Sequence, residues 1–391
     1  MTFSLFTLEG LNSFATILYF NYLYFFMREA FGFGNKQNLM LAAFLGFIYV
    51  FAAWQAGRFG QRYGYLTAVK VGFALMAVSL VAAWMVRSVS GQILAASGVT
   101  VGMCFIWPTL EALVSDGAAV ARLPDAIGIY NVVWAVTNAV AYFAGGSLIE
   151  AFGYEIIFTL PLAMVVLQLA LAWWLQRHAA VLARNAVKTA AAPHRPGSPQ
   201  AAAFLRMAWL ANPFAYIAIN TLVAVMPGVA AKFQLLPMLA GFVCSIWCFA
   251  RLAAFVWLWR RTDWHYRFSR LAGSFALLIL SFATILMAPD LLALIAAQII
   301  FGGAIGLIYY SSLFYSMDAG EARGEHGGIH EAAIGAGNCA GPAVGALSLQ
   351  FLPQFANSGA VAVSGLLLCG FGGMLAIWRR ANKNRPACPS P

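Results

Sequence analysis

Apolar residues along this chain gather into long runs that are separated by short polar stretches. Twelve of the runs are long enough for a helix to cross a bilayer, which takes about 20 mostly apolar residues. The runs predict helices, because backbone in lipid must satisfy its own hydrogen bonds and a barrel would show short alternating strands instead. The predicted spans cover residues 5–27, 38–57, 66–86, 92–113, 126–148, 156–176, 205–230, 237–259, 270–288, 291–315, 329–351 and 358–379.

The sequence of one run recurs in the second half of the chain. Residues 41–52 read LAAFLGFIYVFA and residues 239–250 read LAGFVCSIWCFA, identical at six of twelve positions with an offset of 198. At almost the same offset, Gly128, Ile129, Asn138 and Gly145 match Gly328, Ile329, Asn338 and Gly345. Two correspondences with such similar offsets predict a duplicated half.

The longest polar interruption lies between the sixth and seventh runs and includes the stretch PHRPGSPQ. Such a composition is typical of a solvated linker. We therefore expect an N-terminal six-helix bundle over residues 1–176, a cytoplasmic linker over 177–204, a C-terminal six-helix bundle over 205–380 and a cytoplasmic tail over 381–391.

The composition favours a multi-pass membrane protein. Hydrophobic residues make up 62% of the 391 residues and charged residues only 9%, whereas a soluble domain is roughly half apolar and a quarter charged. The first run is expected to be retained as a span, because its first ten residues carry no basic side chain and no small-residue cleavage site follows.

The positions of the basic residues predict the orientation in a cell membrane. With both termini in the cytoplasm, 18 of the 23 Lys and Arg residues fall in inner loops, tails or helix ends, as the positive-inside rule requires. Arg28, Lys36, Arg87 and Lys232 fall outside, and Arg251 lies within a span. The net charge of +10 is therefore a signal of topology. A nucleic-acid partner is not expected, because the basic residues are scattered over separate loops.

The stretch between the second and third spans carries a motif. It reads GRFGQRYGY from Gly57 to Tyr65 and resembles the Gly-x-Leu-Ala-Asp-Arg-x-Gly-Arg loop of the major facilitator superfamily. Gly57, Arg62 and Gly64 match, whereas Gln61 replaces the usual acid and Tyr65 the usual base. The resemblance implies a gating role for the three matching residues. A short turn also needs glycine for positive φ, and an ordinary positively charged inner loop is the alternative interpretation.

A second motif, Gly337-x-x-x-Gly341-Pro342-x-x-Gly345, lies in the eleventh span. It resembles a pattern that antiporters of this superfamily carry in the fifth span, but here it occupies the equivalent span of the other half. Small residues at this spacing let helices approach closely and bend. We therefore favour a packing seam over an antiporter signature.

The layout and the repeat extend the resemblance over nearly the whole chain. It implies an all-α integral membrane protein in which twelve transmembrane helices form two pseudo-symmetric six-helix bundles. In such a protein the bundles rock about a central site in alternating access. We expect a monomer in the inner membrane that uses no cofactor.

Arg251 is the sharpest functional candidate, because a charge near mid-bilayer is costly and by default functional. Its repeat equivalent is Ala53, so only the second half has this charge. We expect Arg251 to bind an anionic or zwitterionic solute or to form a switching ion pair. The alternatives are a side chain that extends to the helix end and a permanent pair with an acid.

Glu111 and Glu331 are the candidates for proton coupling, because a carboxyl group within a span can load and release a proton. Glu331 can instead stabilise the first turn of its helix through the helix dipole. Glu111 lies near a helix C-terminus, where the dipole gives no such stabilisation.

Further polar and aromatic groups are expected to line a cavity. Asn138 and Asn338 match across the repeat, and each shares a helix face with the polar residue seven positions earlier, Asn131 or Glu331. The other candidates in these spans are Asn12, Asn21, Trp134, Asn220, Tyr309, Tyr310, Ser311 and Ser312. Each of them alone can be a packing residue.

Other chemistry is not indicated. His326, His330 and Glu331 have no further ligands beside them, whereas a zinc site needs three or four. The six cysteines lie mostly within spans as small core residues, and no phosphate-binding Walker loop occurs.

We therefore expect a secondary transporter that moves a small organic solute with polar or anionic groups, and proton coupling stays open. An efflux antiporter for amphipathic compounds is the alternative. A membrane-embedded enzyme would need a clustered nucleophile or metal set, and a non-transporting receptor would bring a sizeable extramembrane domain; the sequence shows neither.

Overall fold

The computed structural model describes residues 2–116, 123–184, 199–318 and 325–383, and these ranges fold into helices without any strand. The helices in chain order are α1 (Thr2–Phe31), α2 (Asn35–Tyr63), α3 (Tyr65–Met85), α4 (Val89–Asp116), α5 (Leu123–Phe152), α6 (Ile156–Arg184), α7 (Pro199–Lys232), α8 (Pro237–Cys244), α9 (Ile246–Trp259), α10 (Phe268–Met287), α11 (Leu291–Asp318), α12 (Glu325–Phe351) and α13 (Ser358–Lys383). We refer to α1–α6 as the first half and to α7–α13 as the second half.

Most of these helices are long and apolar enough to cross a membrane. Within the described residues, eleven helical segments meet this condition, and α8 and α9 together make one of them. The remaining helix, α1, is 30 residues long but includes Glu9, Asn12, Asn21, Arg28 and Glu29 in its sequence, and it is not among the eleven. The prediction of an all-helical, multi-pass membrane protein is confirmed.

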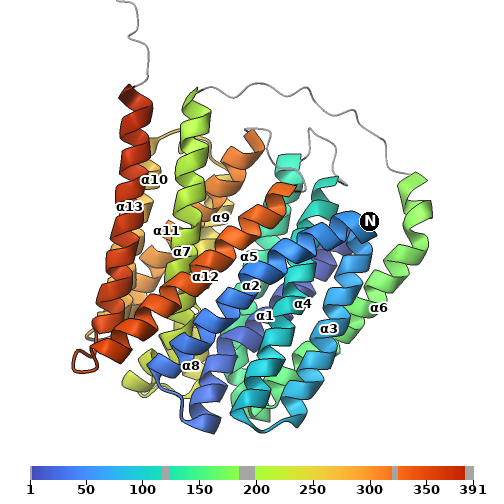
Figure 1. Ribbon diagram of the computed structural model, residues 1–391, viewed down its shortest axis with the longest axis horizontal. Coiled ribbons are helices and arrows are strands. Elements are labelled where there is room, and N and C mark those ends of the chain that lie inside the picture. Colours follow the sequence, from blue (N-terminus) through green and yellow to red (C-terminus); the bar gives the residue numbers. More distant parts are fainter. Residues whose placement is uncertain (1, 117–122, 185–198, 319–324, 384–391) are drawn as a thin grey trace, which may run out of the picture.

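Two helices extend into the predicted linker. α6 continues to Arg184 instead of ending near residue 176, and α7 begins at Pro199 instead of near residue 205. Residues 185–198 of the predicted linker lie outside the described residues. Figure 1 shows the end of α6, the start of α7 and the end of α13 at the same end of the molecule.

The turn between α2 and α3 is shorter than the sequence predicted. α2 continues to Tyr63, so Gly57 and Arg62 are helical and a loop over the whole motif is wrong. Gly64 alone separates the two helices and has a φ of +91°. This value confirms that a glycine with positive φ makes the turn, because a residue with a Cβ rarely adopts it.

The helix of the eighth predicted span has a one-residue break at Ser245, between α8 and α9, although Ser245 keeps an αR backbone and the segment forms one span. The sequence gives no sign of the break, because neither proline nor glycine occurs there. The buried side chain of Gln298 in α11 donates a 2.9 Å hydrogen bond to the carbonyl of Val243. A side-chain donor from a neighbouring helix thus satisfies a backbone acceptor beside the break.

The two halves contact each other along α2 and α12, and along α5 with α8 and α9. α2 and α12 lie side by side across the front of Figure 1. A Cβ on Gly46 of α2 would lie 2.5 Å from the backbone of Asn338, and a Cβ on Gly341 would lie 2.5 Å from the carbonyl oxygen of Ile217 in α7. Gly341 therefore takes part in close helix packing, as the packing interpretation of its motif requires.

Candidate functional site

A central cavity of about 160 Å³ lies between helices of both halves. Its wall is formed by side chains from α1, α2, α4, α5, α7, α9, α11 and α12. None of its lining residues comes from α3, α6, α10 or α13. A single water needs only about 10–15 Å³, so the space can hold several waters or a small organic molecule.

Arg251 of α9 lies on the wall of this cavity and is only 3% exposed. Its guanidinium carbon is 4.2 Å from the ring centroid of Trp134 in α5 and 5.0 Å from that of Trp247 in α9. Trp247 lies one turn before Arg251, so the two side chains share a helix face. Among the described residues, no carboxylate lies within 4.0 Å of Arg251 and its Nε has no hydrogen-bond partner.

Asn138 of α5 connects Arg251 to Trp134. With its amide oriented so that the oxygen meets donors, Asn138 accepts hydrogen bonds from Arg251 Nη2 and Trp134 Nε1, each at 3.2 Å. Such amide orientations are assigned from the hydrogen-bond network. The guanidinium is thus held by two indole faces and one neutral amide.

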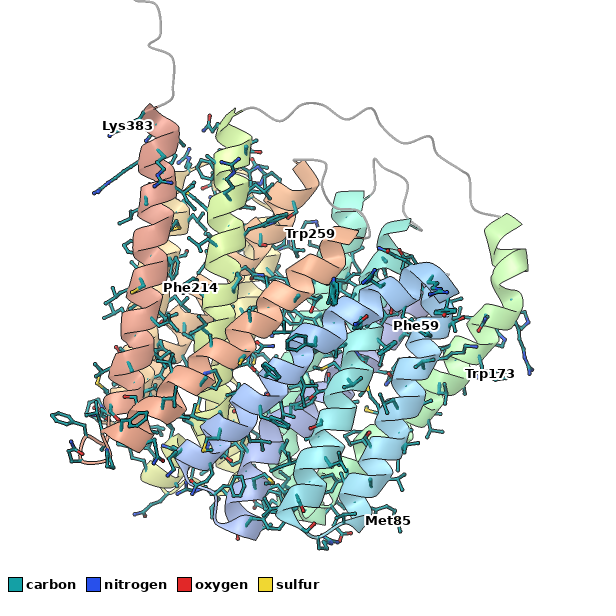
Figure 2. All side chains as sticks on the ribbon, viewed as in Figure 1. Phe59, Met85, Trp173, Phe214, Trp259 and Lys383 are labelled. Carbon is teal, nitrogen blue, oxygen red and sulfur yellow. The ribbon has the colours of Figure 1, made fainter. Side chains whose placement is uncertain are left out.

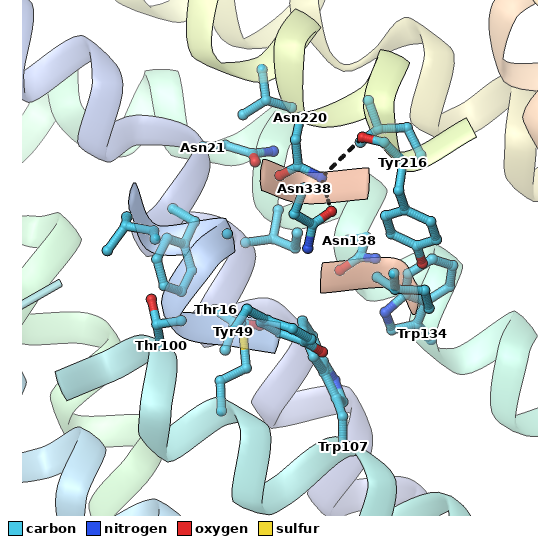
Figure 3. Close-up of a pocket in the computed structure, with 18 of the residues that line it drawn as sticks. Thr16, Asn21, Tyr49, Thr100, Trp107, Trp134, Asn138, Tyr216, Asn220 and Asn338 are labelled. Carbon is cyan, nitrogen blue, oxygen red and sulfur yellow. Dashed lines mark hydrogen bonds between the residues drawn. The ribbon is translucent and has the colours of Figure 1, made fainter. Parts of the chain in front are cut away.

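The repeat-related residue Asn338 of α12 makes a different contact. Asn220 of α7 donates a hydrogen bond to the amide oxygen of Asn338 and a second one, at 3.3 Å, to the carbonyl of Tyr216. Figure 3 shows Asn220 and Asn338 pointing toward each other, with Asn138 and Trp134 nearby. The two matched asparagines therefore line the same cavity but hold different partners.

Glu331 of α12 is buried and bonded to the other half of the chain. The hydroxyl of Tyr49 in α2 donates a 2.5 Å hydrogen bond to the Glu331 carboxylate. Both residues line the cavity. This contact joins the two halves through a group that can gain or lose a proton.

A third acid, Glu9 of α1, is fully buried near this site. Its carboxylate accepts hydrogen bonds from Ser13 at 2.6 Å and from Tyr130 of α5 at 2.8 Å. Glu9 was not among the predicted site residues, although an acid in an otherwise apolar span is the same signal that indicated Glu111 and Glu331. Tyr130 lines the cavity, so Glu9 contacts the cavity wall through this hydrogen bond without being a lining residue itself.

Glu111 of α4 lines the same cavity as Glu331. No Lys, Arg or His nitrogen among the described residues lies within 4.0 Å of Glu9, Glu111 or Glu331. One buried cation and a group of three carboxyl groups thus share this region without pairing directly.

Nine of the predicted site residues line the cavity: Asn21, Glu111, Trp134, Asn138, Asn220, Arg251, Tyr309, Glu331 and Asn338. Tyr309 stacks on Trp134, with ring centroids 5.3 Å apart. Tyr310 does not line the cavity and packs against Phe255 and Trp264 instead. Asn12 is buried in α1 but is not a lining residue either.

Several lining residues were not selected from the sequence, including Thr16, Tyr49, Thr100, Trp107, Tyr130 and Tyr216. Among the residues that the structure describes, no three His, Cys, Asp or Glu side chains are placed to hold a metal ion. The side chains of His326 and His330 lie outside that description.

The chain was compared with protein families, curated proteins and solved structures. The profile of the Major Facilitator Superfamily matches residues 5–342. A search of curated proteins returns no match. Several solved structures have a similar fold at low sequence identity.

One is a bacterial homologue of the human lysosomal transporter Spinster in an inward-facing and occupied conformation, 13% identical over 99% of this chain and 98% of that one, with a TM-score of 0.71. A variant of the peptide transporter POT is 14% identical over 98% and 95%, with a TM-score of 0.70. The nucleoside transporter NupG is 13% identical over 97% and 99%, with a TM-score of 0.71. The family is one of transporters and not of enzymes, and the profile match covers most of the chain, which therefore belongs to the Major Facilitator Superfamily.

Proposed function

We propose that this protein is a secondary active transporter that moves a small organic solute with an anionic group by alternating access, coupled to protons. The observation that carries the proposal is the setting of Arg251. It lies on the cavity wall, 3% exposed, with no carboxylate within 4.0 Å among the described residues.

The surroundings of Arg251 stabilise its charge without neutralising it. Cation–π contacts contribute about 0.5–2 kcal/mol each, and the Asn138 oxygen adds a hydrogen bond. A buried cation without a counter-ion is costly. An anionic group of a solute would remove that cost by binding the guanidinium in a bidentate manner, which supports an anion as the bound group.

Three acidic side chains support the coupling of transport to protons. Glu9, Glu111 and Glu331 lie near the cavity without a cationic partner within 4.0 Å in the described part of the chain. Carboxyl groups in such a setting are typical of proton pathways in membrane proteins. Protonation of Glu331 would alter its hydrogen bond to Tyr49, and so a contact between the halves.

The proposal includes the arrangement in the membrane. One bundle comprises α1–α6 and the other α7–α13, in which α8 and α9 make one span, and the two bundles move against each other around the cavity. The termini and the linker face the cytoplasm, in agreement with the positive-inside pattern, and the protein acts as a monomer in the inner membrane without a cofactor.

An efflux antiporter for amphipathic compounds is the second candidate. The aromatic side chains on the cavity wall favour it: Phe20, Tyr24, Tyr49, Trp107, Tyr130, Trp134, Tyr216 and Tyr309. The two candidates differ in the ligands that they bind, because an amphipathic-compound antiporter accepts neutral or cationic aromatic molecules.

The test has two steps. Purified protein is screened by thermal unfolding against metabolite and drug panels, since a ligand that binds the folded state raises its apparent stability. Compounds that stabilise the protein are then offered to proteoliposomes with an imposed pH gradient. The proposal expects stabilising compounds to be anionic and to accumulate with the gradient. Stabilisation by neutral or cationic aromatic compounds alone would support the antiporter.

A further inference from the structure

A second set of basic and aromatic side chains lies far from the cavity, on the outer face formed by α3 and α6. These two helices pack against each other and contribute nothing to the cavity wall. Trp173 of α6 is 50% exposed on this face. Figure 2 shows Trp173 at the outer edge of the molecule.

Two cations from different helices converge on this one indole. Lys70 Nζ of α3 is 5.1 Å from the ring centroid of Trp173, and the guanidinium carbon of Arg177 of α6 is 5.0 Å from it. Among the described residues, neither cation has a carboxylate within 4.0 Å. The positive charge of the pair is therefore not compensated by a described acidic side chain.

The pair lies near one end of the apolar segments of α3 and α6. The span of α3 begins at Tyr65, five residues before Lys70, and the span of α6 ends at His178, one residue after Arg177. Both positions are thus within about two turns of the same end of the apolar segments, given a rise of about 1.5 Å per residue. At this end, α6 continues to Arg184, into the predicted linker.

The surface toward the membrane centre is apolar. Val166 lies two turns before Trp173 on the same helix face and is 51% exposed, and its neighbour Leu167 is 63% exposed. On α3, Val78 lies two turns beyond Lys70 and is 67% exposed. The cations can bind the anionic head of an amphiphile, and the exposed apolar strip beside them can contact its apolar tail.

We propose that Lys70, Trp173 and Arg177 form a binding site for the phosphate headgroup of an anionic phospholipid in the leaflet on the linker side. The phosphate is bound by both cations, which Trp173 holds in place, and the acyl chains lie along Val166 and Val78. Charge complementarity favours an anionic lipid over a zwitterionic one. The apolar strip favours a lipid over free phosphate.

The test measures thermal unfolding of the purified full chain in dodecyl maltoside with added phosphatidylglycerol, phosphatidylcholine or inorganic phosphate. We expect phosphatidylglycerol to raise the midpoint more than phosphatidylcholine, and inorganic phosphate to leave it unchanged. The double variant Lys70→Gln/Arg177→Gln should lose about half or more of the increment specific to phosphatidylglycerol. Native mass spectrometry should show correspondingly less retained phosphatidylglycerol.

The matched control is Arg58→Gln/Arg261→Gln. It removes the same formal charge, and each of its arginines contacts a single tryptophan, Trp54 or Trp257. Arg261 also pairs with Asp263 at 3.4 Å. This control should keep the full increment, and the charge-conserving swap Lys70→Arg/Arg177→Lys should keep most of it. Equal losses in the double variant and the control would overturn the proposal, as would an equal increment from inorganic phosphate. Neither readout depends on transport, so this proposal and the proposed function can fail separately.

Discussion

The hydroxyl of Tyr49 lies 2.5 Å from a carboxylate oxygen of Glu331 and donates a hydrogen bond to it, although the residues are 282 positions apart. The bond joins α2 of the first half to α12 of the second on the wall of the cavity. A hydrogen bond to a charged carboxylate is stronger than one to its neutral form. Loss or gain of a proton at Glu331 would therefore change how firmly the halves are held together here.

Glu331 and Glu111 are predicted to couple solute transport to the proton gradient. A carboxyl group that loads and releases a proton in the cycle cannot be replaced by its amide without uncoupling transport from the gradient. We expect Glu331→Gln and Glu111→Gln to abolish solute accumulation driven by a pH gradient in proteoliposomes. Solute–solute exchange should continue, because it does not require the empty carrier to reorient.

Tyr49→Phe is the control for the first prediction. It removes the hydrogen bond to Glu331 and keeps the carboxyl group, so accumulation should persist with a shifted pH profile. Proton coupling through these acids is wrong if both glutamine variants still concentrate solute with an unchanged pH profile.

The second prediction concerns the stability that Glu9 provides. Glu9→Ala leaves the buried hydroxyls of Ser13 and Tyr130 without their acceptor, at a cost of about 1–3 kcal/mol per unsatisfied group. Glu9→Gln keeps an acceptor oxygen and should be less destabilised. Thermal unfolding of the two variants checks this order, and equal midpoints would show that these hydrogen bonds contribute little.

The third prediction uses Asn138, whose oxygen lies 3.2 Å from Arg251 Nη2 in the bonded orientation. Asn138→Asp places a carboxylate there, and the resulting ion pair would compete with an anionic solute. We expect affinity to fall by about tenfold or more, which is about 1.4 kcal/mol. Asn338→Asp, at the repeat-related position, is the matched control and should weaken binding far less. Similar losses in both variants would argue against a direct role of the Asn138–Arg251 contact.

The fourth prediction concerns the linker. Halves split near Pro196 and co-expressed should restore at least part of the transport, because two folded bundles associate through their own interface. A cysteine at Gly197 should resist an impermeant reagent added to intact cells. Labelling from outside would reverse the proposed orientation.

Most elements of the fold could be predicted from the sequence because long apolar runs are local signals. The break at Ser245 could not be predicted, since the donor beside it, Gln298, comes from α11. The motif predicts a glycine turn, which the structure has at Gly64. The motif does not indicate that α2 continues to Tyr63.

The sequence indicated which helices contribute to the cavity wall better than it indicated which side of each helix faces the cavity. Tyr309 lines the cavity and its neighbour Tyr310 does not, because adjacent helical residues point about 100° apart. Tyr49 and Tyr130 were missed, since their acids lie 282 and 121 positions away in the sequence. A single sequence gives the period of a helix but not its rotation toward its neighbours.

Arg251 is proposed to bind the anionic group of the solute. Binding measurements can compare the affinity of a stabilising carboxylate compound with that of its neutral amide, on the wild-type protein and on Arg251→Gln. We expect the wild type to bind the acid about tenfold or more tightly than the amide, since hydrogen bonds to charged groups contribute about 1.5–3 kcal/mol. Arg251→Gln should bind the two compounds equally. A variant that keeps the full preference for the acid would contradict the claim and would assign anion recognition to another part of the cavity.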